Sequence, residues 1–395
     1  MSMLENTLCH AAFGDILLDA NGDILPCCFI ERDRNTLKIK DVDDLNDWFF
    51  NDKGMTSLRE NLATNIKDKK CNVCWKAEAE NKWTLRTGSG EYKLQPPKNK
   101  LLQITGGRLC NLACRMCSPS LSSMIQIENR PWDDNIDLPL MYNWIDDPSN
   151  VTKVINLVNN QDIEDMQLQG GEPQLMKGFI DIMTQIDSKK KSQISVQVTT
   201  NASVFNEQFW EQAVKFRRVQ AGLSIDATGS RYDVIRYHGD WQTTKKNCDK
   251  IINYLWTHKI DSDATWDSNP AVNLNIVLQL ANIDQCDVMN TFYEHLQERC
   301  PGLDYEFTLM PINNNNSWDI QNLPLEILNS LPNIKADTQL AEQWRGRINY
   351  AIENNGYNKY HKKQVLIREE HFLNVYGKNL WREKSGWWKI YNVSS

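Results

Sequence analysis

Leu109-Cys110-Asn111-Leu112-Ala113-Cys114-Arg115-Met116-Cys117-Ser118-Pro119 is the stretch that decides the fold, because it places three cysteines in one short loop. Iron–sulfur clusters are held by cysteine thiolates, and a cluster that only carries electrons takes four of them. Three thiolates without a nearby fourth leave one iron open to an outside ligand. The spacing C-x3-C-x2-C of Cys110, Cys114 and Cys117 therefore predicts a 4Fe-4S cluster with one exchangeable corner.

A second motif follows at the distance of one strand and one helix. Met166-Gln167-Leu168-Gln169 has the character of a short buried strand, and it runs directly into Gly170-Gly171-Glu172-Pro173. Two glycines allow the backbone to approach a ligand closely, and the Glu172 carboxylate can accept hydrogen bonds from an ammonium group. The tetrapeptide therefore predicts a ligand-binding loop.

Together these two motifs resemble the signature of the radical S-adenosylmethionine (SAM) enzymes. The resemblance implies that the three cysteines bind a 4Fe-4S cluster that chelates SAM at its open iron. It also implies that one electron breaks the S–C5' bond, and that the resulting 5'-deoxyadenosyl radical removes a hydrogen atom from a substrate. The GGEP residues would hold the amino end of SAM: Gly170, Gly171, Glu172 and Pro173.

Three further positions resemble the same family. Met116 precedes the third cysteine, where the family has an aromatic or large apolar residue whose backbone meets the adenine. Ser224-Ile225-Asp226-Ala227 resembles a strand end of the form S-x-D-G, with Ala227 in place of the usual glycine. Arg236 resembles the arginine that contacts the SAM carboxylate, a contact that suits a planar guanidinium. The alternative for Arg236 is a solvated helix arginine, because arginines are common at protein surfaces.

Composition limits the class of protein. The 395 residues, 41% hydrophobic and 24% charged, suffice for a large core and a second domain. No apolar stretch approaches the ~20 residues of a membrane span, and residues 1–10 lack the pattern of a signal peptide. We therefore expect a cytoplasmic protein without a membrane partner. Eleven cysteines then favour metal binding over disulfides, and a net charge of -7 disfavours duplex nucleic acid as a partner.

The middle of the chain alternates apolar runs with amphipathic stretches, which predicts parallel strands joined by helices. We expect an α/β fold with a partial (β/α)6 barrel, as the radical SAM family has. The predicted strands cover residues 101–105, 166–169, 194–199, 219–225, 272–280 and 305–310, and the predicted helices cover 179–186, 208–216, 243–256 and 286–296.

Polar residues recur where these strands end. Parallel barrels place their chemistry at the carboxyl ends of the strands, so these side chains should meet in one pocket. Asn201 follows the third strand, and Ser224 ends the fourth together with Asp226. Gln279 ends the fifth strand. Taken singly, Asn201 is also a typical helix cap, Asp226 a typical turn residue and Gln279 an ordinary interior polar group.

Five more cysteines precede the barrel. Cys27 and Cys28 follow two short strands around an Asn-Gly turn, and this hairpin should bring them near Cys9. Cys71 and Cys74 form a C-x2-C pair, a spacing at which two thiolates on one turn bind the same metal. Four ligands are therefore available for a second metal site.

This segment resembles the twitch half of SPASM/twitch domains, which hold an auxiliary 4Fe-4S cluster, and its position resembles the subgroup with an N-terminal twitch domain. The resemblance implies Cys9, Cys27, Cys71 and Cys74 as ligands, with Cys28 the alternative to Cys27. A zinc site of four cysteines has the same sulfur spacing. Other cysteines lie in or beside helical patterns and read as buried apolar side chains: Cys248, Cys286 and Cys300.

We expect a twitch/SPASM-like domain over residues 1–95, the barrel over 96–311 and a helical, aromatic and basic extension over 312–395. The connector before the barrel contains Pro96-Pro97, and the extension has helical patterns near residues 325–331, 340–352 and 364–373. Residues 356–395 carry eight Lys or Arg against three Asp or Glu. The basic residues and the aromatic ones among them could stack on a base or sugar and hold a phosphate: Trp381, Trp387, Trp388 and Tyr391. The alternative is a helix packed over the side of the barrel with a solvated basic face, because such charge runs usually lie at the surface.

Two classes of function remain. The first is a radical SAM oxidoreductase or isomerase that takes electrons from a reductase or a flavodoxin-type donor. It would act on a peptide side chain or a small sugar-like or nucleoside-like molecule, giving oxidation, a cross-link or epimerisation. The second is a non-catalytic zinc or iron–sulfur module that binds a protein or single-stranded nucleic acid, but this class leaves Gly170 to Pro173 unexplained. No motif marks the substrate.

Overall fold

The computed structural model describes residues 6–33, 36–88, 93–98, 100–129, 143–259, 269–312, 318–331, 333–357, 362–363 and 365–366. The chain divides into two compact units. The first contains residues 1–110, 119–199 and 206–220, and the second contains residues 111–118, 200–205 and 221–395. The domain boundaries expected near residues 95 and 311 stay predictions.

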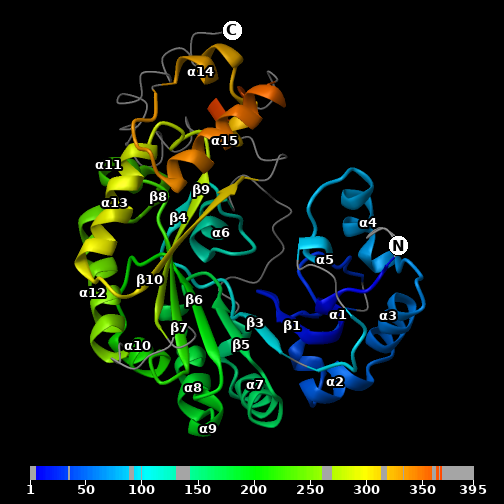
Figure 1. Cartoon of the computed structure of the whole chain (residues 1–395). Helices are drawn as coiled ribbons and strands as arrows, with labels where there is room; N and C mark the ends of the chain where they lie inside the picture. Colours follow the sequence, from blue (N-terminus) through cyan, green and yellow to red (C-terminus); the bar gives the residue numbers. More distant parts are fainter. Residues whose placement is uncertain are drawn as a thin grey trace. The chain divides into compact units, whose positions relative to one another are not determined.

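The first unit is built on a mostly parallel sheet with the strand order β2–β1–β3–β5–β6 (Figure 1). The β1–β3, β3–β5 and β5–β6 pairs are parallel, whereas β1 and β2 form an antiparallel hairpin. Ile16, Leu102, Met166 and Val196 lie side by side in register, and each is fully buried. These strands are β1 (Asp15–Leu18), β2 (Ile24–Leu25), β3 (Leu101–Thr105), β5 (Asp165–Gln169) and β6 (Ser195–Thr200).

The hairpin turn between β1 and β2 is fixed by Asp19. Its Oδ1 atom accepts hydrogen bonds from the backbone N–H groups of Asn21 (2.7 Å) and Asp23 (2.9 Å). Gly22 has a φ of 77°, a conformation that favours glycine. The predicted Asn-Gly hairpin is therefore confirmed.

Helices of the first unit pack their apolar faces against one another and the sheet. In α7, Asp147 caps the amino end by accepting from the backbone of Ser149 (2.8 Å), Pro148 occupies the first turn, and Val154 and Leu157 are fully buried. The helices are α1 (His10–Gly14), α2 (Leu45–Asn51), α3 (Lys53–Ala63), α4 (Asn72–Ala79), α5 (Leu85–Gly88), α6 (Ser123–Asn129), α7 (Pro148–Asn160), α8 (Lys177–Gln185), α9 (Ser188–Lys191) and α10 (Glu207–Ala213).

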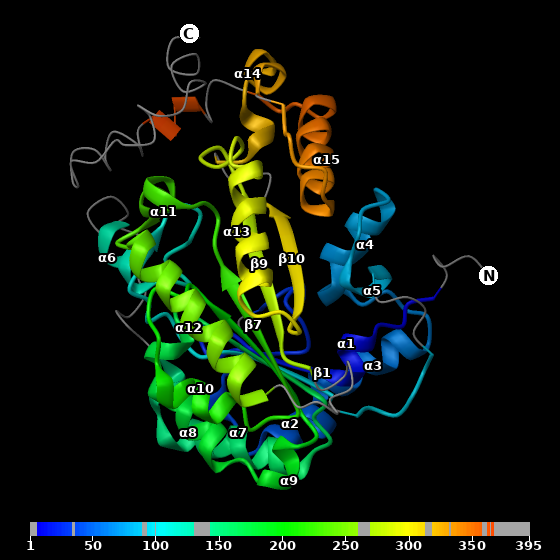
Figure 2. The same ribbon diagram turned by 60° about the vertical axis from the view of Figure 1, so that its left-hand side comes forward.

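The second unit continues the α/β pattern. Strand β9 pairs in parallel with β10, and Figure 2 shows both beside α13. The end of β7 joins β9 through a hydrogen bond from the Ile225 N–H to the Asn275 carbonyl (3.0 Å). A separate antiparallel ladder pairs β4 with β8. The elements are β4 (Ala113–Cys114), β7 (Arg218–Ser224), α11 (Gly229–Ile235), β8 (Arg236–Tyr237), α12 (Trp241–Lys259), β9 (Ala271–Leu278), α13 (Cys286–Arg299), β10 (Asp304–Pro311), α14 (Leu325–Ser330) and α15 (Gln339–Glu353).

Short 3-10 turns complete the two units. They are η2 (Ile39–Asp41), η3 (Lys69–Cys71), η4 (Trp144–Asp146), η5 (Pro173–Leu175) and η6 (Ile320–Asn322).

The six predicted strands are confirmed as β3, β5, β6, β7, β9 and β10, each within two residues of its expected ends. The four predicted helices correspond to α8, α10, α12 and α13, and two tail helices to α14 and α15. The fold is α/β with mainly parallel strands, as a partial barrel requires. None of the helices in the described ranges is long and apolar enough to cross a membrane. The aromatic tail residues Trp381 to Tyr391 and most of the pattern at 364–373 lie outside the described residues.

Two glycines in helices provide a matched test of this packing. A Cβ added to Gly178 in α8 would lie 1.9 Å from the Ile145 carbonyl oxygen, whereas a Cβ on Gly346 in α15 would meet nothing within 4 Å. Gly178→Ala should therefore lower the free energy of unfolding by about 1–3 kcal/mol. Gly346→Ala should raise it by about 0.5–1 kcal/mol, because alanine is the better helix former. Denaturant titrations followed by circular dichroism measure both, and equal stability of the two variants would contradict this packing.

Candidate functional site

The loop that carries Cys110 begins where β3 ends. Gly107 has a φ of 152°, and a Cβ there would lie 2.4 Å from the Asn143 Oδ1 atom, so only glycine fits. The same oxygen accepts hydrogen bonds from the backbone N–H groups of Arg108 (3.1 Å) and Leu109 (3.0 Å). Asn143 therefore fixes the start of the loop, although no sequence motif pointed to it.

Cys110 itself is 8% exposed and is held by Ser123. The Cys110 N–H donates to Ser123 Oγ (3.1 Å), and the same hydroxyl donates to the Cys110 carbonyl (3.2 Å). This reciprocal pair ties the first cysteine to the start of α6. The sequence did not single out Ser123, because a serine at a helix start is usually only a cap.

The GGEP loop packs directly on the beginning of the cysteine loop. A Cβ on Gly171 would lie 2.1 Å from the Leu109 carbonyl oxygen, closer than any real contact. The Glu172 N–H donates to that oxygen (2.8 Å), and the Gly171 N–H donates to the Gly107 carbonyl (3.2 Å). The two loops are therefore in direct contact, and this contact depends on glycine at position 171.

The Glu172 carboxyl group is fully buried. Its Oε1 atom accepts from the backbone N–H of Gln174 (3.2 Å), so Glu172 caps the short turn η5 in which Pro173 is the first residue. Gln174 in turn accepts from the indole N–H of Trp210 (2.9 Å) and the backbone of Asn206 (2.9 Å). These bonds hold the GGEP loop in one conformation.

In the second unit, Cys114 lies opposite Arg236 in the β4–β8 ladder. The Arg236 Nη1 atom is 3.9 Å from Cys114 Sγ, and Nη2 is 2.9 Å from Asp226 Oδ2. Arg236 is 6% exposed and Asp226 is fully buried, so the interpretation of Arg236 as a solvated helix residue is wrong. Burial acts to lower the pKa of the guanidinium, but Asp226 and Cys114 outweigh it, so the pKa is raised and the group stays charged.

Asp226 also organises the end of β9. Its Oδ1 atom accepts from the Val277 N–H (2.8 Å), and its carbonyl accepts from Asn282 Nδ2 (2.9 Å). Asn282 Oδ1 accepts from the Gln279 N–H (2.8 Å). Gln279 is fully buried, and both polar atoms of its side chain lack a hydrogen-bond partner within the described residues. Asn282, which the sequence analysis missed, links the two predicted residues.

Asn201 belongs to a polar network with the cysteine loop. Its Nδ2 atom donates to Asn111 Oδ1 (3.3 Å), and its Oδ1 atom accepts from Ser203 Oγ (2.6 Å). Asn111 Nδ2 donates to the same hydroxyl (2.8 Å). The interpretation of Asn201 as a helix cap is wrong, because Asn206 caps α10.

The remaining predicted residues of the second unit are partly exposed. Met116 lies in the turn between Cys114 and Cys117, and the Cys117 N–H donates to the Cys114 carbonyl (3.0 Å). Ser224 is half-buried at the end of β7. Arg115, missed by the sequence analysis, is 4% exposed and donates from Nε to the Val234 carbonyl (2.7 Å).

The N-terminal cysteines Cys9, Cys27, Cys71 and Cys74 line one cavity, as the hairpin and the C-x2-C pair predicted. Cys28 is exposed and does not line it. Burial, together with a smaller effect of neighbouring thiols, raises the pKa of Cys27 to about 12 and that of Cys74 to about 11. In the described ranges, no three His, Cys, Asp or Glu side chains are gathered closely enough to hold a single metal ion.

Apolar and charged side chains complete this cavity. Arg86, Phe29 and Trp75 line it with the four cysteines. Arg86 forms a buried ion pair with Glu78 and lies 5.0 Å from the Trp75 ring. The remaining cysteines Cys248, Cys286 and Cys300 are at most 2% exposed, which confirms their prediction as buried side chains.

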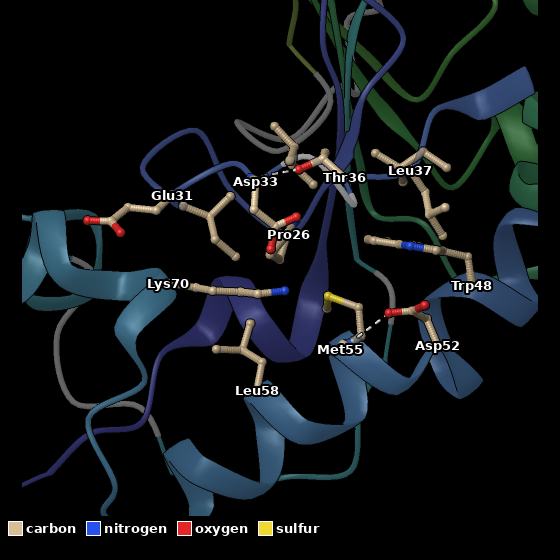
Figure 3. Close-up of a pocket in the computed structure, with 14 residues that line it drawn as sticks. Pro26, Glu31, Asp33, Thr36, Leu37, Trp48, Asp52, Met55, Leu58 and Lys70 are labelled. Carbon is tan, nitrogen blue, oxygen red and sulfur yellow. Dashed lines mark hydrogen bonds between the residues drawn. The ribbon is translucent and has the colours of Figure 1, made fainter. Parts of the chain in front are cut away.

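A larger cavity of about 360 Å³ lies elsewhere in the first unit (Figure 3). Trp48, Met55 and Leu58 form apolar walls, and the Lys70 side chain extends into it. The sequence analysis missed this cavity because its lining comes from scattered positions that share no motif.

Residues 104–260 match the Radical SAM superfamily. Residues 104–260 therefore form a radical SAM superfamily domain, a class of domain that uses a 4Fe-4S cluster and SAM. The matched range contains the cysteine loop, the GGEP loop, Asn201, Asp226 and Arg236. The resemblance to this superfamily is thereby confirmed. No curated protein sequence matches the chain.

Three solved structures show what the chain is similar to. Streptococcus suis SuiB bound to S-adenosylmethionine is 14% identical with a TM-score of 0.39, over 79% of this chain and 61% of SuiB. TYW1 with a lysine-pyruvate adduct is 15% identical with a TM-score of 0.34, over 62% of this chain and 73% of TYW1. The radical SAM methyltransferase TsrM from Kitasatospora setae, with cobalamin and a [4Fe-4S] cluster, is 12% identical with a TM-score of 0.36. The match covers 63% of this chain and 43% of TsrM. The chain thus spans about three fifths of SuiB.

Proposed function

We propose that this protein is a radical SAM oxidoreductase or isomerase that abstracts a hydrogen atom from a peptide side chain or a small sugar-like or nucleoside-like substrate. The outcome would be oxidation, a cross-link or epimerisation. The main support for this proposal is the close approach of Gly171 to the Leu109 carbonyl, within the range that matches the superfamily. This approach packs the GGEP loop against the start of the cysteine loop, an arrangement that a non-catalytic metal-binding module does not need.

Three cysteine thiolates are a suitable ligand set for a 4Fe-4S cluster that also binds SAM. Cys110, Cys114 and Cys117 would hold the cluster, leaving one iron for SAM. When bound, the cluster and SAM supply a 5'-deoxyadenosyl radical. Arg236 already lies near the Cys114 sulfur, and a positive charge beside a ligating thiolate raises the reduction potential of a cluster.

The chain's own residues would bind and orient the SAM molecule. Glu172 would accept from its ammonium group, and the glycines before it let the backbone approach closely. Asn201, Ser224 and Asp226 would line the same site, and so would the Met116 backbone and the Gln279 amide. The buried, unpartnered amide of Gln279 supports this role, because an unsatisfied polar side chain is costly unless a ligand completes it.

We further propose that Cys9, Cys27, Cys71 and Cys74 bind an auxiliary 4Fe-4S cluster. This proposal is supported by the four thiols that line one cavity, because four cysteine thiolates are the usual ligands of such a cluster. The auxiliary cluster would accept an electron from the substrate or contact it. A reductase or flavodoxin-type protein would supply the reducing electron.

The first test measures SAM cleavage. The protein reconstituted anaerobically with iron and sulfide should release 5'-deoxyadenosine when dithionite and SAM are added. Cys114→Ala should abolish this release and lower bound iron by about four atoms per chain. Cys300→Ala, at a buried cysteine outside both sites, is the matched control and should keep the activity. Wild-type protein that holds zinc and leaves SAM intact would refute the enzyme and support a binding module.

The second test compares two adjacent cysteines. Cys27 lines the N-terminal cavity and Cys28 does not, so Cys27→Ala should lower bound iron by about four atoms per chain while Cys28→Ala leaves it unchanged. Iron and zinc analysis of the reconstituted variants measures this difference. Equal losses in the two variants, or zinc in place of iron in the wild type, would contradict the assignment.

A further inference from the structure

Arg108 is a buried arginine with incomplete pairing. It follows β3 in the cysteine loop and is 2% exposed. Its Nη2 atom donates to Asn21 Oδ1 in the β1–β2 turn. Its Nε and Nη1 atoms are buried and have no hydrogen-bond partner within the described residues. The guanidinium therefore has donors at Nε and at Nη1 that no group within the described residues uses.

The carboxylates nearby are already neutralised by other cations. Asp19 Oδ2 is 2.6 Å from Arg32 Nη1, and the two backbone N–H groups of the turn use Asp19 Oδ1. Asp23 pairs with Lys38 Nζ at 2.5 Å and with Arg32 at 3.5 Å. These two carboxylates face two cations, so the charge of Arg108 is surplus in this cluster.

The position of Arg108 is one where ligands bind. Strands β1 and β3 are parallel, with Leu18 opposite Ile104, so both end at the same edge of the sheet. The indole N–H of Trp144 donates to the Asp19 carbonyl (2.7 Å) and to the Thr105 carbonyl (2.9 Å), which clamps the two strand ends together. Parallel α/β sheets bind their ligands at the carboxyl ends of the strands.

A buried charge without a counter-ion destabilises a fold, and a neutral side chain in its place usually restores stability. Such a group is therefore understandable if a ligand supplies the missing charge. A carboxylate or phosphate oxygen is the acceptor that suits a guanidinium N–H group best, because the hydrogen bond then joins opposite charges. Arg86 shows the alternative within the same unit, because it is also buried but forms a bidentate pair with Glu78.

We propose that the unpartnered N–H groups of Arg108, at Nε and Nη1, bind an oxyanion, a carboxylate or phosphate, of the enzyme's ligand. Placing this subsite in the active site rests on the proposed function. Two molecules can bring the oxyanion: the substrate, or SAM through its own carboxylate. If the substrate brings it, the enzyme selects anionic substrates.

The test uses the full-length protein, reconstituted anaerobically, with inorganic phosphate as the probe. The melting temperature Tm is measured in chloride and in phosphate at equal ionic strength. Phosphate should raise the Tm of the wild type. Arg108→Gln should melt above the wild type in chloride, because the unpaired charge is gone, and phosphate should not raise its Tm further.

Arg231→Gln is the matched control. Arg231 is 8% exposed, and its Nη1 atom donates to the Ala281 carbonyl (2.6 Å) and pairs with Asp284 Oδ1 (3.2 Å). Its loss should lower the Tm and leave the phosphate response intact. If Arg108→Gln also lowers the Tm in chloride, or responds to phosphate as the wild type does, Arg108 is structural and the proposal fails.

A second arm identifies the source of the oxyanion. If the substrate brings it, Arg108→Gln binds SAM with the wild-type dissociation constant. If SAM brings it, the dissociation constant rises about tenfold or more, as expected for a lost charged pair. Failure of the proposed function is a separate result, because it would appear as wild-type protein that does not cleave SAM, whatever phosphate does to the Tm.

Discussion

The carbonyl oxygen of Leu109 is the atom on which the site in the first unit depends. It accepts the Glu172 N–H at 2.8 Å, and it lies where any side chain at Gly171 would have to go. The GGEP loop after β5 is therefore held against the cysteine loop after β3. Asn143 holds the other side of that loop through two backbone N–H groups. The placement of Cys110 follows from these backbone contacts rather than from the cysteine itself.

Two buried arginines, Arg236 and Arg108, differ in whether a carboxylate pairs with their positive charge. Arg236 is compensated by Asp226 at 2.9 Å and stays charged beside the Cys114 sulfur. Arg108 forms no ion pair with a carboxylate of the described residues, although Asp19 in the turn beside it acts on its charge at longer range. Since an uncompensated buried charge costs stability, the first arrangement is explained by the protein alone and the second calls for a ligand.

Much of the fold was predictable from local pattern. The strands β3, β5 and β6 are short apolar runs with alternating burial, and a hairpin with an Asn-Gly turn is fixed by neighbouring residues, so periodicity and turn chemistry suffice. The parallel pairing of β1 with β3 was not predicted. These strands are far apart in the sequence, and their register depends on side chains that meet only after folding.

The site was predictable where a motif fixed the spacing. The cysteines and the GGEP loop were found in this way, whereas Asn143, Asn282 and Arg108 were missed. Asparagine and arginine are common in loops for structural reasons, and only burial and hydrogen bonding distinguish the ones that organise a site. Asn201 shows the converse, since its residue type suggested a cap but its amide bonds to Asn111.

The central claim is that SAM binds directly to a cluster held by the cysteine loop. Electron paramagnetic resonance of the dithionite-reduced protein tests it most directly, in the Cys27→Ala variant so that the loop cluster alone gives a signal. The account predicts that adding SAM changes the g-values of that signal. A signal that SAM leaves unaltered, in protein with a full complement of iron at the loop, would contradict it.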